Sequence, residues 1–157
     1  MTQIKRGIRF KRVFISGTFD MLHSGHITFL KEASKYGELF VGMGSDYSIE
    51  KYKGKKPVCG EDERLFMVKA IRYVTEAWIN SGEGPLDFIE DLEHTNPDIY
   101  ICNEDQGSEE RESICQELGI EYIVLPRTQE KGLPARSTTN YRLHRQSDDE
   151  ENFMMSL

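Results

Sequence analysis

Two histidines in a glycine-flanked segment are the residues whose type and spacing point most directly to chemistry. The segment from Gly17 to His26 reads GTFDMLHSGH and follows a short apolar run. The three-residue spacing places both imidazoles, of His23 and His26, on one side of a helix that begins near Ser24. Glycine lets a backbone approach a ligand closely, and a helix N-terminus attracts anions. This pattern favours a phosphate chain as the ligand. A metal is the alternative for a histidine pair, but no third ligand of that type stands nearby in the sequence.

The elements that must position this segment are predicted by the alternation of apolar patterns. Short apolar runs suited to buried strands alternate with segments that repeat apolar residues at helical spacing. The predicted strands are Arg12–Ser16, Leu39–Met43, Glu76–Asn80, Ile99–Cys102 and Glu121–Leu125. The predicted helices are Ser24–Gly37, Arg64–Val74 with the acids Glu61 to Glu63 in its first turn, Pro85–Glu93 and Glu109–Leu118. Five strands alternating with helices predict an α/β, three-layer, Rossmann-like fold with a five-stranded parallel sheet.

The loops that follow the strands are the expected place for the site. In open parallel sheets, ligands bind beyond the carboxyl ends of the strands. The loops concerned are residues 17–23, 45–60, 103–107 and 126–136. The 157 residues suit a single domain, which we assign to residues 1–145. Residues 146–157 are predicted to be an acidic C-terminal tail, either mobile or a short helix docked on a neighbour.

The segment GTFDMLHSGH resembles the signature of the HxGH nucleotidyltransferase superfamily. The resemblance extends from about Arg12 to Arg142 and is strongest to the cytidylyltransferases acting on glycerol phosphate and ethanolamine phosphate. The adenylyltransferase domain acting on heptose 1-phosphate is similar too. The resemblance implies that His23 and His26 contact the nucleotide phosphates and stabilise the transition state. It also implies a Mg²⁺ ion held mainly by the phosphates, with no metal ligand from the protein.

Further residues are assigned by this resemblance, position by position. Lys53, which precedes Gly54, is the better match to the lysine that reaches the phosphates, and Lys51 is the second choice. A solvated basic loop is the alternative for this cluster. The catalytic residues expected on this basis are His23, His26 and Lys53. The expected nucleotide-binding residues are Gly17, Thr18, Phe19, Asp20, Gly25, Lys51, Arg64, Asn103, Asp105, Arg127, Thr128, Ser137, Thr138 and Thr139.

The sequence departs from the family pattern shortly before its end. Seven residues, Glu130 to Arg136, separate Gln129 from Ser137, where the family usually has two. This longer loop adds the cations Lys131 and Arg136. Because it lies beside residues expected to bind phosphate, we expect it to contact the acceptor substrate.

These observations predict a cytidylyltransferase that moves CMP from CTP to a phosphorylated alcohol or sugar and releases pyrophosphate. An acceptor phosphate is already anionic and needs no general base, so donors and cations suffice. An adenylyltransferase using ATP and a sugar phosphate is the first alternative, and a nucleotide-sensing domain without turnover is the second.

The composition excludes some classes of partner. The net charge is −7, from 20 Lys and Arg against 27 Asp and Glu, which disfavours nucleic-acid binding and a fragment of a class I aminoacyl-tRNA synthetase. No apolar run matches a signal peptide or a membrane span, so we expect a cytoplasmic protein without membrane contact. The 3 cysteines form neither a disulfide framework nor a metal motif. A homodimer is expected, because symmetric dimers are common.

Overall fold

The computed structural model describes residues 9–156, with side chains for residues 9–143 and 153–156. Its strands are β1 (Arg12–Gly17), β2 (Glu38–Met43), β3 (Glu76–Ile79), β4 (Ile99–Asn103) and β5 (Glu121–Leu125). The α-helices are α1 (Ser24–Ser34), α2 (Asp46–Lys53), α3 (Glu61–Lys69), α4 (Ile89–Thr95), α5 (Glu109–Leu118) and α6 (Thr138–Met155). A short 3₁₀ helix, η1 (Gly84–Leu86), precedes α4.

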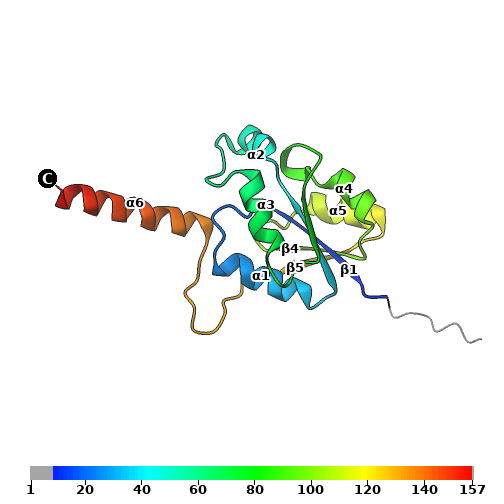
Figure 1. Cartoon of the computed structure of the whole chain (residues 1–157). Coiled ribbons are helices and arrows are strands. Elements are labelled where there is room, and N and C mark those ends of the chain that lie inside the picture. The colour runs from blue at the N-terminus through cyan, green and yellow to red at the C-terminus, as the bar shows by residue number, and fades with distance from the viewer. Residues whose placement is uncertain (1–8, 157) are drawn as a thin grey trace, which may run out of the picture.

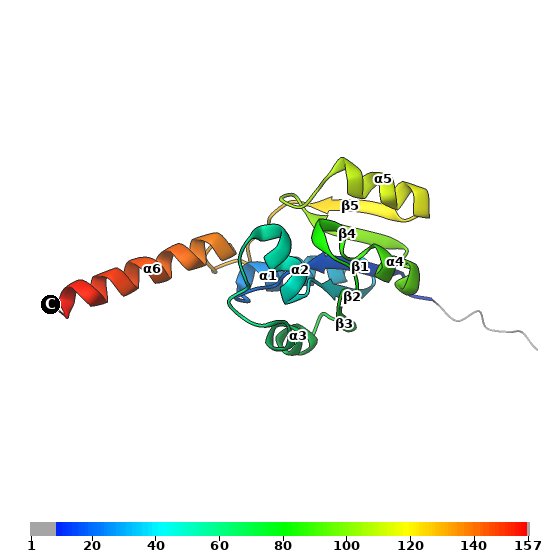
Figure 2. The ribbon, with the colours of Figure 1, turned by 90° about the horizontal axis from the view of Figure 1, so that it is seen from above.

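The strands form one five-stranded sheet in the order β3-β2-β1-β4-β5, and every pairing is parallel (Figures 1 and 2). This confirms the predicted three-layer, Rossmann-like α/β fold. The chain builds outward from β1 to β3, then returns to the other side of β1 to build β4 and β5. The order therefore reverses between β1 and β4, where doubly wound sheets open a crevice at the carboxyl ends of their strands.

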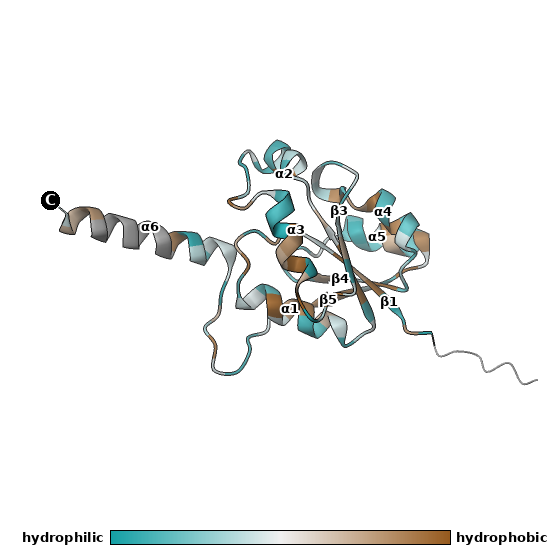
Figure 3. Ribbon diagram, viewed as in Figure 1, coloured by the Kyte–Doolittle hydropathy of each residue, from teal (hydrophilic) through white to brown (hydrophobic). Residues whose placement is uncertain are grey.

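Two apolar clusters cover the two faces of the sheet, and β1 contributes to both. Val13 and Ile15 pack with α1 and α3, whereas Phe14 packs with α4 and α5. Side chains alternate along a strand, so a central strand covered on both faces is apolar at consecutive positions. The Phe14 ring stacks on Tyr100 at 5.6 Å between centroids. The views in Figures 2 and 3 show the helices on both sides of the sheet and the apolar colouring of its central strands.

Several predicted boundaries were wrong, and each has a local cause. Helix α2 lies in the region expected to be a loop, where the Ser45 side chain caps it by accepting from the Ser48 amide at 3.0 Å. It ends at Gly54, whose φ of 72° is left-handed. Helix α3 begins with the predicted acidic turn at Glu61 but ends at Lys69 rather than Val74, because the amides of Ala70 and Ile71 form tight turns with the carbonyls of Met67 and Val68.

The last helix spans the boundary that the sequence analysis assigns between domain and tail. Helix α6 runs without interruption from Thr138 to Met155, across the expected boundary between domain and tail at residue 145. It points away from the sheet (Figure 1). In residues 9–156, no helix has both the length and the apolar character required to cross a bilayer.

The guanidinium of Arg64, on α3, joins the loops that surround the carboxyl ends of β1 and β2. This side chain is fully buried, at 0% exposure. It donates to the carbonyl oxygens of Thr18 at 2.7 Å, Gly44 at 2.9 Å and Cys59 at 3.0 Å. Its charge is balanced by Asp46, at 2.7 Å. A buried cation needs such partners, and only a planar fork of donors reaches several oxygens at once.

We expect Arg64→Lys to destabilise the protein by about 3 kcal/mol, because an ammonium cannot replace the guanidinium on three carbonyls and a carboxylate. Urea unfolding followed by circular dichroism measures this change. The exposed Arg72 supplies the matched control, since Arg72→Lys should stay within about 0.5 kcal/mol of the parent. Equal urea midpoints for the Arg64 and Arg72 variants would contradict the role given to Arg64.

Candidate functional site

The three predicted catalytic residues come together at the carboxyl end of β1. His23 is the N-cap of α1. The Lys53 amine, from the last turn of α2, donates to the Thr18 hydroxyl at 3.3 Å. From the far end of the chain, Thr138 places its hydroxyl 3.5 Å from Nε2 of His23. The site is therefore assembled from the β1–α1 loop, α2 and the start of α6.

The two histidines hold each other in place through the first turn of α1. Nδ1 of His23 accepts from the Gly25 amide at 3.1 Å, and Nδ1 of His26 accepts from the His23 amide at 3.3 Å. The rings stack with 3.9 Å between centroids. An imidazole nitrogen that accepts a hydrogen bond carries no proton, so each neutral ring holds its proton on Nε2. Both histidines thus present an Nε2–H donor.

Burial keeps these imidazoles neutral. It lowers the pKa of His26 to about 3, and the neighbouring His23 and Arg127 act in the same direction while Asp20 opposes them. The pKa of His23 is lowered by burial and then by the positive charges of Arg127 and Arg136. At neutral pH the ligand-free site therefore offers neutral donors for a phosphate oxygen, and the cations supply the positive charge.

The backbone between β1 and α1 is strained and filled by protein. Phe19 and Met21 have φ values of 52° and 48°, in the left-handed region that non-glycine residues rarely adopt. Gly17, Phe19 and Gly25 are expected to approach the nucleotide, and for their backbone groups this stays a prediction. The Phe19 side chain is only 5% exposed and belongs to the core, and a Cβ on Gly17 would lie 2.8 Å from its ring. A Cβ on Gly25 would lie 2.7 Å from the carbonyl oxygen of Arg136.

Asp20 and Arg64, both expected to contact the nucleotide, instead have buried side chains that bond to protein. The Asp20 carboxylate accepts from the amides of Val58 and Cys59, both at 2.9 Å, and from Arg142 at 2.7 Å. Burial raises the pKa of Asp20, but these three bonds outweigh it and lower the pKa overall. Arg142 was missed in the sequence. Its spacing of four from Thr138 places both on one face of α6 and could have identified it.

The two candidate lysines of α2 point to different partners. Lys53 reaches Thr18, as described above, and is not ion-paired within the part of the chain that the structure describes. Lys51 instead pairs with Glu83 at 2.6 Å, and that hydrogen bond raises the pKa of its amine. Lys53 is therefore the lysine available to a phosphate beside the histidines.

The remaining predicted residues line the side of the site formed by β4, β5 and α6. Asn103 accepts from the Asp105 amide at 3.1 Å, and Asp105 forms an ion pair with Arg127. Ser137 accepts from the Asn140 amide at 3.2 Å and so caps α6. The side chains of Thr128 and Thr139 are exposed.

The carboxylates are not arranged to hold a metal. In the described residues, no group of three His, Cys, Asp or Glu side chains is placed around a common centre. Asp20, the acid beside the histidines, already accepts from two amides and an arginine. A protein-held Mg²⁺ therefore does not fit this site, and Mg²⁺ carried by the phosphates stays a prediction.

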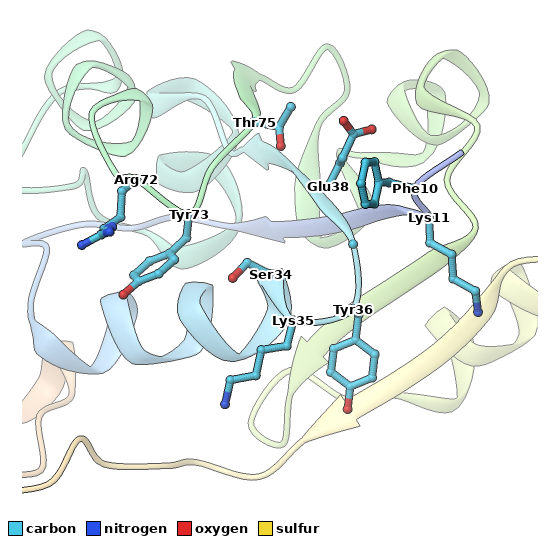
Figure 4. A pocket seen from close by; sticks show the side chains of 10 residues that line it. Phe10, Lys11, Ser34, Lys35, Tyr36, Glu38, Arg72, Tyr73 and Thr75 are labelled. Atoms are coloured by element: carbon cyan, nitrogen blue, oxygen red, sulfur yellow. The ribbon is translucent and has the colours of Figure 1, made fainter. Parts of the chain in front are cut away.

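Two cavities lie outside the histidine site. One of about 590 Å³ sits at the opposite, amino-terminal ends of β1 and β2 (Figure 4). Two of its cations, Lys11 and Lys35, already pair with glutamates, so it offers little charge to an anion. A smaller cavity of about 370 Å³ lies between α1 and the loop of residues 130–136, where Lys31 pairs with Glu130 at 2.7 Å.

Comparison with known proteins assigns the family. The model of the family described as Cytidylyltransferase-like matches residues 14–144. The protein belongs to this family. It is accordingly an enzyme of the nucleotidyltransferase kind, and the predicted HxGH superfamily membership is confirmed.

Similar curated proteins are named FAD synthase. The chain is 42% identical over 102 residues to the one from Methanohalophilus mahii, covering 64% of this chain and 68% of the relative. It is 38% identical over 117 residues to the one from Aciduliprofundum boonei, covering 73% and 76%. A solved lipopolysaccharide core biosynthesis protein from Thermoplasma volcanium has a TM-score of 0.65 and 31% identity, covering 78% of this chain and all of that one.

We expect His26→Ala to lower kcat about a hundredfold to a thousandfold, because its Nε2–H donor would act on charge that develops in the transition state. His26→Gln keeps an N–H donor and should lose less. The exposed His94 provides the control variant, His94→Ala, which should keep the parental kcat. Steady-state rates measure all three.

The pH dependence gives a second readout of the same prediction. Because burial lowers the pKa of His26 to about 3, its ring loses no proton as the pH rises from 6.5 to 8. The profile of kcat/KM, which reports free-enzyme ionisations, should show no fall that depends on His26 in that interval. A falling limb near pH 6.5 that disappears in His26→Gln would contradict neutral donors.

We expect Lys53→Ala to lower kcat/KM for the triphosphate by about tenfold to a hundredfold, the loss typical of one charged hydrogen bond. Lys51→Ala, a matched change two residues away, should stay within about threefold, because Glu83 already occupies that amine. Initial rates measured at varied concentrations of the triphosphate give kcat/KM for both variants and show which lysine is needed. Equal losses in the two variants would indicate a solvated basic helix end instead.

Proposed function

We propose that the protein is an FMN adenylyltransferase, which transfers AMP from ATP to FMN and forms FAD and pyrophosphate. The relatives named FAD synthase, at 38–42% identity, carry the choice of substrates. These relatives favour transfer of AMP from ATP, the alternative in the sequence analysis, over the CTP-dependent reaction that it prefers. They also favour FMN over a sugar phosphate as the acceptor. The histidine pair supports the type of reaction, which is the transfer of a nucleotidyl group to a phosphate.

The reaction needs positioning and charge stabilisation rather than a base. An oxygen of the FMN phosphate attacks the α-phosphorus of ATP, and the bond from that phosphorus to the oxygen bridging to the β-phosphorus breaks. Pyrophosphate leaves with the bonding electron pair. Because the attacking phosphate is already anionic, no side chain has to remove a proton. This matches a site whose groups are donors and cations.

The residues divide this work between them. The Nε2–H groups of His23 and His26 donate to the oxygens of the α-phosphate as their charge grows in the transition state. Lys53, held beside Thr18, contributes a positive charge to the same phosphates. Asp20 and Arg142 act indirectly, because their ion pair fixes the start of α6 against the β1–α1 loop.

The test is the formation of FAD. The full chain is incubated with FMN, ATP and Mg²⁺, and chromatography follows the flavins while a coupled assay follows pyrophosphate. We expect FAD and pyrophosphate in equal amounts, with CTP replacing ATP poorly. The double variant His23→Ala/His26→Ala serves as the inactive control.

The acceptor arm of the experiment uses glycerol 3-phosphate, ethanolamine phosphate and heptose 1-phosphate in place of FMN. None of them should release pyrophosphate at a rate comparable to FMN. Release with CTP and one of these acceptors, together with no FAD from ATP and FMN, would overturn the proposal and restore the cytidylyltransferase interpretation.

A further inference from the structure

Arg136 lies beside the histidine pair, although the family pattern does not assign it. It precedes Ser137, and its carbonyl oxygen packs against Gly25 in the first turn of α1. Its guanidinium lies over the Tyr141 ring, 5.6 Å from the centroid. The Tyr141 ring is in turn stacked toward His23, at 6.3 Å between centroids. The half-buried Arg136 cation is therefore held next to His23.

The arginines around the site differ in how their charge is balanced. Arg64, Arg127 and Arg142 each form an ion pair with an aspartate. Among the side chains that the structure describes, no carboxylate lies within ion-pairing distance of Arg136, and its guanidinium donates no hydrogen bond. A positive charge left unbalanced beside two neutral imidazole donors suits an anionic ligand group.

We propose that Arg136 binds the β- and γ-phosphates of the nucleoside triphosphate and holds them as they leave as pyrophosphate. The inference deepens the proposed function and rests on it for the identity of the reaction. When the bond between the α-phosphorus and the bridging oxygen breaks, negative charge accumulates on the departing diphosphate. A guanidinium in place beforehand stabilises that charge, and its fork of donors matches phosphate oxygens.

The geometry favours the diphosphate over the acceptor phosphate as the partner. In an in-line displacement the acceptor and the leaving group lie on opposite sides of the α-phosphorus. Lys53, which acts on the α-phosphate, reaches the site from α2, whereas Arg136 reaches it from the segment before α6, next to Thr138. Beyond the effect of burial, Arg127 and Arg136 both lie near enough to His23 to lower its pKa, but Asp105 balances the charge of Arg127, so Arg136 supplies the unbalanced positive charge on this side. The diphosphate is the more negative of the two groups.

This assignment gives the two cations of residues 130–136 different roles, whereas the sequence analysis expects the whole loop to contact the acceptor. Lys131 is exposed at the far end of the loop, while Arg136 is half-buried against the catalytic residues. The two cations therefore form a matched pair for experiment. Each substitution removes one positive charge from the same loop, but only one should affect the phosphates.

The experiment first measures binding of inorganic pyrophosphate to the full chain by calorimetry, without any flavin. Arg136→Ala and Arg136→Gln should weaken it about tenfold to a hundredfold, the range expected for a charged hydrogen bond. Arg136→Lys should recover part of the loss. Lys131→Ala should bind as the parent does. Thermal unfolding of each variant shows whether the fold is retained, and the more conservative Gln and Lys variants keep the test decisive if the Ala variant fails to fold.

Steady-state kinetics then separates the two substrates. Arg136→Gln should raise the KM for ATP, and for pyrophosphate in the reverse reaction with FAD, by tenfold or more, while the KM for FMN changes less than about threefold. A selective rise in the KM for FMN, unchanged pyrophosphate binding, or no pyrophosphate binding by the parent chain would each overturn the assignment. If the parent makes no FAD but Arg136→Gln still loses pyrophosphate binding, the proposed acceptor fails and the role of Arg136 stands.

Discussion

The site depends on one cation buried without access to water. Arg64 sits under the loops that follow β1 and β2 and bonds to a carbonyl oxygen of each, as well as to the turn before its own helix. Loop carbonyls at the end of a parallel sheet have no strand partner, so they need another donor when they are buried. A single guanidinium supplies it. The positions of Thr18, and through it of Lys53, follow from this interaction.

The histidine pair shows how secondary structure can prepare a chemical group. Most helices begin with a hydroxyl or a carboxylate that accepts from the free amides of the first turn. Here His23 takes that position, and His26 completes the reciprocal bond. The capping bonds orient both rings and keep the proton on the outward nitrogen of each. The helix start and the catalytic donors are therefore one arrangement, and neither can be altered independently.

The sequence predicted most of the fold and several of the residues that meet at the carboxyl end of β1. The pattern of apolar residues was enough to predict five strands that alternate with helices, because buried parallel strands are apolar at nearly every position. It did not reveal whether a polar residue faces inward. Phe19 and Asp20 stand in the signature and Arg64 lies on α3, yet all three side chains are buried and support the β1–α1 loop from beneath. Burial of a charged group depends on partners far away in the chain, which spacing alone does not identify.

The contact between Asp20 and Arg142 joins residues 122 positions apart. Contacts of such long range form slowly, because the entropy of closing the long loop is lost before the contact compensates for it. The sheet, whose longest pairing joins Val13 to Ile99, and the capped start of α1 use contacts of shorter span that involve no residue of α6. The site is complete only when the start of α6 contacts the β1–α1 loop through Thr138 and Arg142. Because Thr138 and Arg142 are synthesised after the other residues of the site, the site is completed during synthesis only when nearly the whole domain has left the ribosome.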